Sequence, residues 1–358
     1  MPDRADRIHL VVLFGGQSAE HDVSCVTASA VLGAADAGKY RITPIGISRD
    51  GSWALAAGAQ RALAAGADAL PSRLDPEGDA VTPDVVLAPN GDERTVVLPL
   101  LHGPMGEDGT VQGLLELADV AYVGCGVLGS ALAMDKALAK QVLAFNGIAQ
   151  ARYRAFRDHE RTPGLPNDLV AELGLPCFVK PANMGSSVGV TKAHTVEELR
   201  DAIDVALAYD EWVVVEEAVT AREIEVGVLG TTDPQASGAG EIVPGAEFYD
   251  YEDKYVTDGA QLLIPAPLTP AETAEVRALA VRVFEVLRCD GLARVDFLFE
   301  EGGRGFLCNE ANTMPGFTPV SMYPKLWQAA GVSYAELIDR LVELAVERHG
   351  RRRRNTAR

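Results

Sequence analysis

Apolar runs and helical patterns alternate through the first third of the chain. The apolar runs, each of a length suited to a strand, span residues 9–14, 41–47, 95–101 and 121–123. The first run ends at Gly15 and Gly16, and a helix is predicted to follow from about Ser24. Strands that alternate with helices indicate a parallel α/β domain, which we expect to end near Gly126.

The rest of the chain predicts two further units of mixed helices and strands. The first unit has helical patterns over residues 130–146 and 196–208 and strands at 177–179, 188–191 and 212–216. The second unit has a strand at 223–229, a polar loop at 248–259, a helix over 270–287, a strand hairpin and a closing helix over 334–347. We therefore expect three domains and a disordered basic tail. Their bounds are 1–126, 127–217, 218–350 and 351–358.

Charged and amide side chains alternate on two adjacent segments near the C-terminus. Arg294 and Asp296 precede a turn around Gly303, and Glu310 and Asn312 follow it. If the segments pair as a hairpin, the period of two places alternate residues on one face, and the turn sets Asp296 roughly opposite Glu310. Opposite side chains lie on the order of 5 Å apart at Cβ, where two carboxylates repel unless a cation lies between them.

An oxygen-only ligand set indicates a hard cation. Two carboxylates and one amide, without His or Cys, suit Mg²⁺, which retains waters and takes phosphate oxygens as further ligands. An exposed hairpin with a polar face is the alternative, and the spacing alone does not decide between the two. Apolar neighbours such as Val295, Phe297 and Leu307 favour a buried hairpin, in which unpaired acids are rare. We expect a metal and nucleotide site here.

The charge of the chain favours a small-molecule substrate. Lysine and arginine number 32 against 51 acidic residues, which gives a net charge of −19. This argues against nucleic acid and against an anionic membrane as partners. The polar N-terminus leads into an apolar run too short for a signal peptide or a membrane span, so we expect a cytoplasmic protein. Five widely spaced cysteines among apolar residues are predicted to be reduced and buried.

Several residues are candidates for contacts with phosphate groups. Lys180 ends a predicted strand and leads into a Gly/Ser loop that contains Ser186 and Ser187. Backbone N–H groups and hydroxyls in such a loop cradle phosphates, although a plain strand connection has the same composition and the Walker order is absent. Lys136, at a helix start, is either a phosphate ligand or a surface charge. Glu216, at a strand end, is either a nucleotide ligand or a solvated carboxylate.

Two further candidates follow strands of the first domain. Glu20 lies in a strand-to-helix turn that lacks the third glycine of a dinucleotide fingerprint, and a carboxylate at this position suits an ammonium group. His102 follows another strand, at the edge where open α/β sheets bind ligands. A buried structural histidine is equally compatible with its position.

Taken in order, the motifs of the chain resemble those of D-alanine-D-alanine ligases of the ATP-grasp superfamily. They are GGQSAEHDVS at 15–24, LHG at 101–103, GEDG at 106–109, MDK at 134–136, GSSVG at 185–189, YDYEDKY at 249–255 and EANTMPGFT at 310–318. Each motif alone is weakly specific, but the combination spans nearly the whole chain and is highly specific. The resemblance implies an α/β, ATP-grasp architecture with an N-terminal parallel α/β substrate-binding domain, a small central α+β domain and a C-terminal α+β domain that carries the metal site.

The resemblance also implies an activity. ATP would phosphorylate the carboxylate of a first D-alanine, and the amine of a second would attack the acyl phosphate to give D-alanyl-D-alanine, ADP and phosphate for peptidoglycan precursor synthesis. The small-molecule partners would be D-alanine and ATP. The cofactor would be Mg²⁺, as two ions, with Mn²⁺ as a substitute. The family further leads us to expect a homodimer.

Nucleotide and metal contacts follow from the same resemblance. The metal ligands would be Asp296, Glu310 and Asn312. The phosphate contacts would be Lys136, Lys180, Ser187 and Lys254. The adenosine contacts would be Glu216, Ala218, Val219 and Glu223. Ala218 stands where relatives often carry an aromatic residue, but backbone recognition of adenine survives that change.

Substrate and catalytic roles follow in the same way. The substrate contacts would be Glu20 for the first ammonium, His102 near the first carboxyl end and Ser321 for the second carboxylate. Arg294 and the Gly316 N–H would stabilise the tetrahedral oxyanion. Ser186 and Tyr255 would form a hydrogen-bonded set with Glu20 that closes the loop at 248–259 and excludes water.

Three rival functions differ from this interpretation. A ligase of the same fold that joins D-alanine to D-lactate or D-serine is the nearest, but the pair Lys254 and Tyr255 favours the dipeptide. A non-catalytic nucleotide-binding regulator would not need Arg294 together with a full set of metal ligands. A nicotinamide dehydrogenase would need the missing fingerprint. The variable stretch at 58–89 carries no motif.

Overall fold

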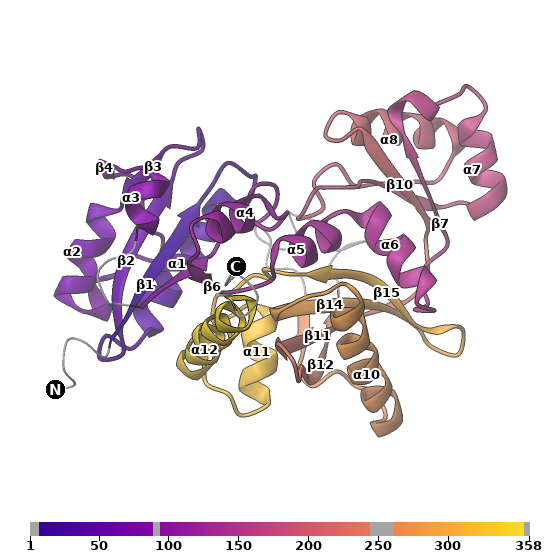
Figure 1. Ribbon diagram of the computed structural model, residues 1–358. Coiled ribbons are helices and arrows are strands. Elements are labelled where there is room, and N and C mark those ends of the chain that lie inside the picture. The colour runs from indigo at the N-terminus through magenta and orange to yellow at the C-terminus, as the bar shows by residue number, and fades with distance from the viewer. Residues whose placement is uncertain (1–6, 89–93, 244–260, 354–358) are drawn as a thin grey trace.

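A computed structural model describes residues 7–88, 94–243 and 261–353 of the protein. It contains three β-sheets, of six, four and five strands. Figure 1 shows the first sheet with its helices at one end of the molecule, the second sheet at the opposite end, and the third sheet beside the junction between them. No described helix is long and apolar enough to cross a membrane.

The first sheet has the strand order β4-β3-β2-β1-β5-β6. Its strands are β1 (Ile8–Gly15), β2 (Tyr40–Ile47), β3 (Trp53–Leu55), β4 (Asp79–Ala80), β5 (Thr95–Pro99) and β6 (Ala121–Tyr122). The four predicted strands β1, β2, β5 and β6 run parallel, and the short strands β3 and β4 add an antiparallel edge. The helices of this unit are α1 (His21–Ala34), α2 (Ala57–Ala65), η2 (Ala67–Ala69), α3 (Pro83–Leu87) and α4 (Thr110–Leu117).

Helix α1 begins at His21, three residues before the start predicted at Ser24. Serine favours N-cap positions, but the buried Ser24 hydroxyl accepts a hydrogen bond from the Gly15 N–H (2.8 Å) and donates one to the Leu100 carbonyl. The hydroxyl therefore joins the carboxyl ends of β1 and β5. The earlier helix start leaves Glu20 in the loop after β1, as the residue that precedes α1.

The second sheet, of order β7-β10-β8-β9, is antiparallel throughout. The elements of this unit are β7 (Tyr153–Arg157), η3 (Asp158–Glu160), α7 (Leu165–Leu173), β8 (Cys177–Pro181), β9 (Thr191–Ala193), α8 (Val196–Leu207) and β10 (Trp212–Glu217). The strand predicted from residue 188 begins only at Thr191. Ser186 and Ser187, before it, have φ values of 49° and 59°, which belong to a turn and not to a strand.

The helix predicted over residues 130–146 is interrupted at Asp135. The two resulting helices are α5 (Val127–Met134) and α6 (Lys136–Phe145). Asp135 has an extended backbone, and its side chain accepts a hydrogen bond from the Leu138 N–H (2.9 Å). Asp135 is therefore the N-cap of α6, and Lys136 occupies the first turn of that helix.

The third sheet, of order β13-β12-β11-β14-β15, is also antiparallel. The elements of this unit are β11 (Arg222–Gly230), β12 (Gln235–Val243), β13 (Gln261–Leu263), α10 (Pro270–Val286), β14 (Gly291–Glu300), β15 (Gly305–Asn312), α11 (Met322–Ala329) and α12 (Tyr334–Arg353). Helix α10 covers one face of this sheet, where Val276 and Phe284 share a buried cluster with Val226 and Val295. The predicted loop at 248–259 lies outside the described residues.

Helix α12 returns to the first sheet, so that the two ends of the chain share one core. Leu337 and Leu341 belong to the same buried cluster as Leu10 and Phe14. The five cysteines are buried and unbridged, as predicted: Cys25, Cys125, Cys177, Cys289 and Cys308. The first and third units are therefore packed together by apolar contacts near the chain termini.

The basic stretch predicted to be disordered begins as part of α12, which extends to Arg353. Arg351 lies 3.6 Å from Asp290, and Arg352 pairs with Glu116 of the first unit. These ion pairs to acidic neighbours explain why the helix continues into the arginine run. The last residues of the tail lie outside the described part of the chain.

Candidate active site

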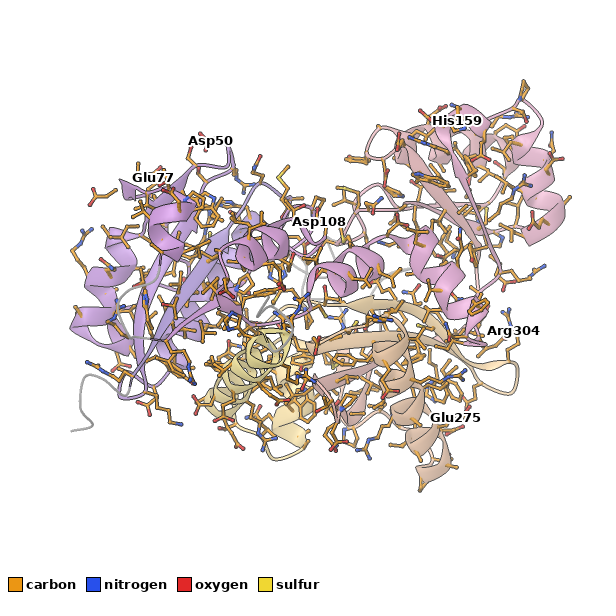
Figure 2. All side chains as sticks on the ribbon, in the orientation of Figure 1. Asp50, Glu77, Asp108, His159, Glu275 and Arg304 are labelled. Carbon is orange, nitrogen blue, oxygen red and sulfur yellow. The ribbon has the colours of Figure 1, made fainter. Side chains whose placement is uncertain are left out.

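The β14–β15 hairpin has the predicted register. Asp296 lies directly opposite Glu310, and Arg294 lies opposite Asn312. The register of the two strands shifts only after Asp296, so the side chains of all four residues lie on one face of the hairpin. Figure 2 shows Arg304 at the outer tip of the hairpin, and the pair Asp296 and Glu310 lies farther along the two strands from this tip.

Arg294 is held between two acids. Its Nε and Nη2 contact the two carboxylate oxygens of Asp296 at 2.8 and 2.7 Å, and its Nε lies 2.9 Å from Glu225 Oε2. Such bidentate pairs are strong and fix the plane of the guanidinium. Burial opposes the charge, but Asp296 and Glu225 raise the pKa of Arg294 well above its ordinary value. The arginine therefore remains charged and oriented beside the pair Asp296 and Glu310.

The predicted metal ligands suit a nucleotide-bound cation. Across the described ranges, no three His, Cys, Asp or Glu side chains form a cluster that could hold a metal. Asp296 and Glu310 supply two carboxylates and Asn312 adds an amide, all from neighbouring positions on paired strands. This oxygen-only set fits Mg²⁺ when phosphate oxygens and water complete the shell, which is the usual arrangement for nucleotide-bound magnesium.

Lys180 connects the second unit to the hairpin. Its Nζ donates to Glu216 Oε2 (3.0 Å) and to Asn309 Oδ1 on β15 (3.4 Å). Burial disfavours its charge, but the carboxylates of Glu216 and Glu310 raise the pKa of Lys180 above its ordinary value. A charged lysine therefore faces the acidic end of the hairpin from the opposite sheet.

The glycine loop reaches the first unit. Lys136 Nζ donates to the Met184 carbonyl at the start of the loop (2.6 Å), and burial lowers the pKa of this lysine. A Cβ added to Gly185 would lie 3.0 Å from Glu20 Oε2, so the absence of a side chain lets the loop pass beside this carboxylate. The structure therefore brings Glu20 close to the residue that precedes Ser186.

Glu107, which was not predicted as a site residue, connects the first unit to the third. Its Oε1 accepts a hydrogen bond from the Gly103 N–H (2.8 Å), and its Oε2 accepts one from the Met314 N–H (3.3 Å). His102 Nδ1 lies 2.9 Å from the Met314 carbonyl. The first unit thus holds both backbone groups of Met314, two residues before Gly316.

His102 combines a structural contact with a free nitrogen. The side chain is buried, and its Nε2 has no hydrogen-bond partner among the described residues. A buried polar atom without a partner is costly unless a ligand completes it. Figure 2 shows Asp108, in the same turn, at the junction between the first unit and α5. The contact with Met314 gives His102 a structural role, and a role in substrate binding stays a prediction.

Glu107 makes the stability of the protein depend on pH. Burial, followed by the charge of Glu20, raises the pKa of Glu107 from 4.5 to about 8. Because the folded state then binds the proton more tightly, the free energy of unfolding is expected to fall as pH rises through this interval. Thermal unfolding of the ligand-free protein across the interval measures the slope. Glu107→Gln should reduce this dependence of stability on pH, whereas Glu77→Gln, at an exposed site (Figure 2), should leave it unchanged. Equal slopes for the wild type and both variants would contradict the raised pKa of Glu107.

Gly316 and Ser321 lie together at the start of α11. Ser321 Oγ is 2.8 Å from Thr318 Oγ1 and accepts a hydrogen bond from the Thr318 N–H (3.2 Å). A Cβ added to Gly316 would lie 3.2 Å from the same Ser321 oxygen. The loop that Glu107 and His102 hold at Met314 therefore also carries these two predicted residues.

The predicted adenosine contacts extend from the end of β10 to the start of β11. They are Glu216, Ala218, Val219 and Glu223. Burial would raise the pKa of Glu216, but Lys140 and Lys180 lower it to about 2. The Ala218 N–H donates to the Pro176 carbonyl (3.1 Å), which fixes the backbone here without an aromatic side chain.

Two predicted residues, Lys254 and Tyr255, lie outside the described residues. Three other residues at this site were missed by sequence reasoning. Glu107 lies within a quoted motif, Lys140 is one helical turn from Lys136, and Glu225 alternates with Glu223 on β11. Lys140 and Glu225 could have been found from their spacing, because each lies on the same helix or strand face as a predicted residue.

Two family models match consecutive parts of the chain. The model described as "D-ala D-ala ligase N-terminus" matches residues 9–125, and the model described as "D-ala D-ala ligase C-terminus" matches residues 142–343. Together they account for most of the chain, including the first sheet and the hairpin.

Individual relatives match nearly the full length. The proteins named D-alanine-D-alanine ligase from Chloroherpeton thalassium and Bacillus pumilus are 46% and 48% identical, over 96% of this chain and 98% and 97% of theirs. The solved D-alanine-D-alanine ligase from Coxiella burnetii superposes with a TM-score of 0.82 at 34% identity, covering 98% of this chain and 97% of its own. The VanG D-Ala:D-Ser ligase from Enterococcus faecalis gives 0.80 at 34% identity, covering 95% and 99%.

Proposed function

Because the chain belongs to the D-alanine-D-alanine ligase family, we infer that the side chains gathered where its three units meet form the active site. The protein is an ATP-dependent ligase of ATP-grasp architecture that produces D-alanyl-D-alanine for peptidoglycan precursors. Its substrates are D-alanine and ATP. The assignment of roles to individual residues is our proposal.

The reaction proceeds in two steps. A carboxylate oxygen of the first D-alanine attacks the γ-phosphorus of ATP, which breaks the bond to ADP and forms an acyl phosphate. The amine of the second D-alanine then attacks the acyl carbon, loses its proton and displaces phosphate. Catalysis of phosphoryl transfer rests chiefly on positioning and charge, so residues that align three substrates carry most of the effect.

The first D-alanine binds between the first unit and the glycine loop. Glu20 takes its ammonium group, because this buried carboxylate lies at the start of α1 beside Gly185. His102 Nε2, buried and without a described partner, faces its carboxyl end. Ser321 holds the carboxylate of the second D-alanine, supported by its position next to Gly316.

ATP binds between the second and third sheets. Lys136 and Lys180 contact its phosphates, together with Ser187 and Lys254. Glu216, Ala218, Val219 and Glu223 contact adenosine. The support is that both described lysines are partly buried and feel the charge of Glu310. Lys180 already has a carboxylate partner, Glu216, which a phosphate oxygen would replace.

Asp296, Glu310 and Asn312 would hold two Mg²⁺ ions, for which Mn²⁺ can substitute. Bound Mg²⁺ supplies positive charge to the phosphates during transfer. Arg294 keeps Asp296 oriented and, with the Gly316 N–H, donates to the oxyanion that develops as the amine attacks. Ser186, Tyr255 and Glu20 complete a hydrogen-bonded set that keeps water from the acyl phosphate.

One observation carries this proposal: the three units converge at a single place. The first unit contributes Glu20 next to Gly185 of the second, and Glu107 accepts a hydrogen bond from Met314 of the third. The fold thus brings polar residues of all three units together, as a site shared by the three units requires. A nucleotide-binding regulator would not require the first unit to take part.

Phosphate release from ATP tests the function. We expect release with D-alanine alone, one phosphate for each dipeptide formed, and none with L-alanine or without amino acid. D-serine or D-lactate added to limiting D-alanine tests the second position, where the fold is shared with a D-Ala:D-Ser ligase. Release that is equally fast without any amino acid would contradict a ligase.

Further proposals concern the organisation of the protein. We propose that it is a cytoplasmic homodimer and that its domains span residues 1–126, 127–217 and 218–350. Light scattering at assay concentration measures the oligomeric state. A mass equal to one chain of 38.0 kDa would contradict the dimer.

A further inference from the structure

Lys140 is a buried lysine without a role in the reaction as proposed above. It lies on α6, one turn after Lys136, and its side chain is only 2% exposed. Its Nζ is 3.2 Å from Glu216 Oε1 and 5.2 Å from the centre of the Tyr153 ring. Lysine is almost never this buried unless it is paired. The ion pair with Glu216 is therefore the reason that Lys140 can occupy this position.

Glu216 is shared by two ammonium groups. Lys140 approaches Oε1, and Lys180 donates to Oε2 at 3.0 Å. Lys180 is the more exposed of the two, at 14%, and it also reaches Asn309 beside the predicted metal ligands. Lys180 is thus able to change partners when a ligand binds, whereas Lys140 is enclosed by protein on all sides.

A change of partner at Lys180 has an electrostatic cost. If Lys180 were the sole partner of Glu216, its movement to a phosphate would leave a buried carboxylate without a counter-charge, which is strongly unfavourable. Lys140 removes this cost because it remains beside Oε1. The pair of lysines therefore allows one carboxylate to stay neutralised in both the free and the nucleotide-bound protein.

We propose that Lys140 is a positioning residue for ATP: it holds Glu216 through Oε1 and so frees Lys180 to exchange Oε2 for a phosphate oxygen. This inference rests on the proposed binding of ATP at Lys180. Lys140 itself touches neither nucleotide nor amino acid. Its effect should therefore appear in the affinity for nucleotide and leave the D-alanine sites unchanged.

Lys140→Met removes the charge and keeps the length and apolar contacts of the side chain. We expect the KM for ATP to rise about tenfold or more, because Lys180 is then retained by Glu216. The kcat at saturating ATP and the KM for D-alanine should stay within about twofold of the wild type. Lys140→Gln can still form a hydrogen bond but also lacks the charge, so it should likewise raise the KM for ATP and leave kcat and the KM for D-alanine nearly unchanged.

A double-mutant cycle separates this effect from a packing defect. In Lys140→Met/Glu216→Gln the carboxylate that retains Lys180 is gone, so the increase in KM for ATP should be smaller than the product of the two single increases. If Lys140→Met caused only a packing defect, the increase in KM for ATP in the double variant would equal the product of the two single increases. Thermal unfolding of each variant shows whether the fold is retained.

Lys39→Met is the control. Lys39 also pairs with a carboxylate, that of Asp339, but this pair lies between the first unit and α12, outside the predicted site. Its removal should leave the KM for ATP unchanged. The proposal is overturned if Lys140→Met and Lys140→Gln bind ATP normally, if their kcat and both KM values change alike, or if the cycle is multiplicative.

Calorimetry with an ATP analogue that cannot be hydrolysed, without D-alanine, separates this inference from the proposed function. A tenfold weaker affinity in Lys140→Met supports the role of Lys140 even if the amino-acid specificity of the enzyme differs from D-alanine. The inference is overturned if Lys140→Met binds the analogue with normal affinity. If the wild-type protein then releases phosphate only with D-alanine, the proposed function still stands.

Discussion

We expect Glu310→Gln to lower kcat by roughly a thousandfold while the fold remains intact. Glu310 lies directly opposite Asp296, and its charge acts on Lys136 and Lys180. Glutamine keeps the shape of the side chain and removes one of the two negative charges that face each other across the hairpin. The substitution therefore weakens the hold on the cation that would neutralise the transferring phosphoryl group. It relieves the repulsion from Asp296 and removes an attraction to Lys136 and Lys180, and because these two effects oppose each other the fold should remain.

Phosphate release at saturating Mg²⁺, together with thermal unfolding, measures both parts of this expectation. Glu301→Gln is the matched control, because Glu301 lies in the exposed turn of the same hairpin, 3.6 Å from Arg222. Its kcat should equal that of the wild type. Unchanged turnover in Glu310→Gln would exclude Glu310 from the metal site, and a large loss of thermal stability would make it a structural residue.

Arg294→Lys is expected to lower kcat by about a hundredfold or more, the usual effect of losing a preorganised oxyanion donor. Lysine keeps a positive charge between Glu225 and Asp296 but loses the planar fork that contacts both oxygens of Asp296. Arg294→Ala is less informative. It would leave two buried carboxylates without their partner, at a cost of about 3–5 kcal/mol in stability.

Arg304→Lys provides the comparison for Arg294. Arg304 pairs with Glu300 and Glu217 at the outer end of the same hairpin, away from the three-unit junction. We expect normal kcat in this variant. If Arg294→Lys raised only the KM for ATP and left kcat intact, Arg294 would be a phosphate contact and not an oxyanion donor.

The hairpin could be predicted from sequence because its register depends only on residues within the two strands and the turn between them. A period of two and a glycine turn suffice to set Asp296 opposite Glu310, and the observed register agrees. The parallel strands of the first sheet are equally local, since each is a short apolar run. The break at Asp135 was missed because a continuous helical pattern hides an N-cap whose partner, the Leu138 N–H, is evident only from the backbone.

Contacts between units could not be derived from sequence patterns. Glu107 gains its role from the Met314 N–H, more than 200 positions later, and Lys140 gains its role from Glu216 on another element. A helix was predicted from about Ser24, but α1 begins earlier, and the Ser24 hydroxyl makes tertiary hydrogen bonds to Gly15 and Leu100 although serine favours caps. The resemblance to a family supplied the residues, and the fold supplies the partners that position them.

D-alanine labelled with ¹⁸O in both carboxylate oxygens tests the central claim most directly. In the proposed reaction, one carboxylate oxygen bonds to the γ-phosphorus and leaves with phosphate when the amide forms. Each phosphate released should therefore carry one labelled oxygen, and the other should remain in the new peptide carbonyl. Phosphate without label would mean that water and not the carboxylate of D-alanine attacks ATP, and it would contradict this account.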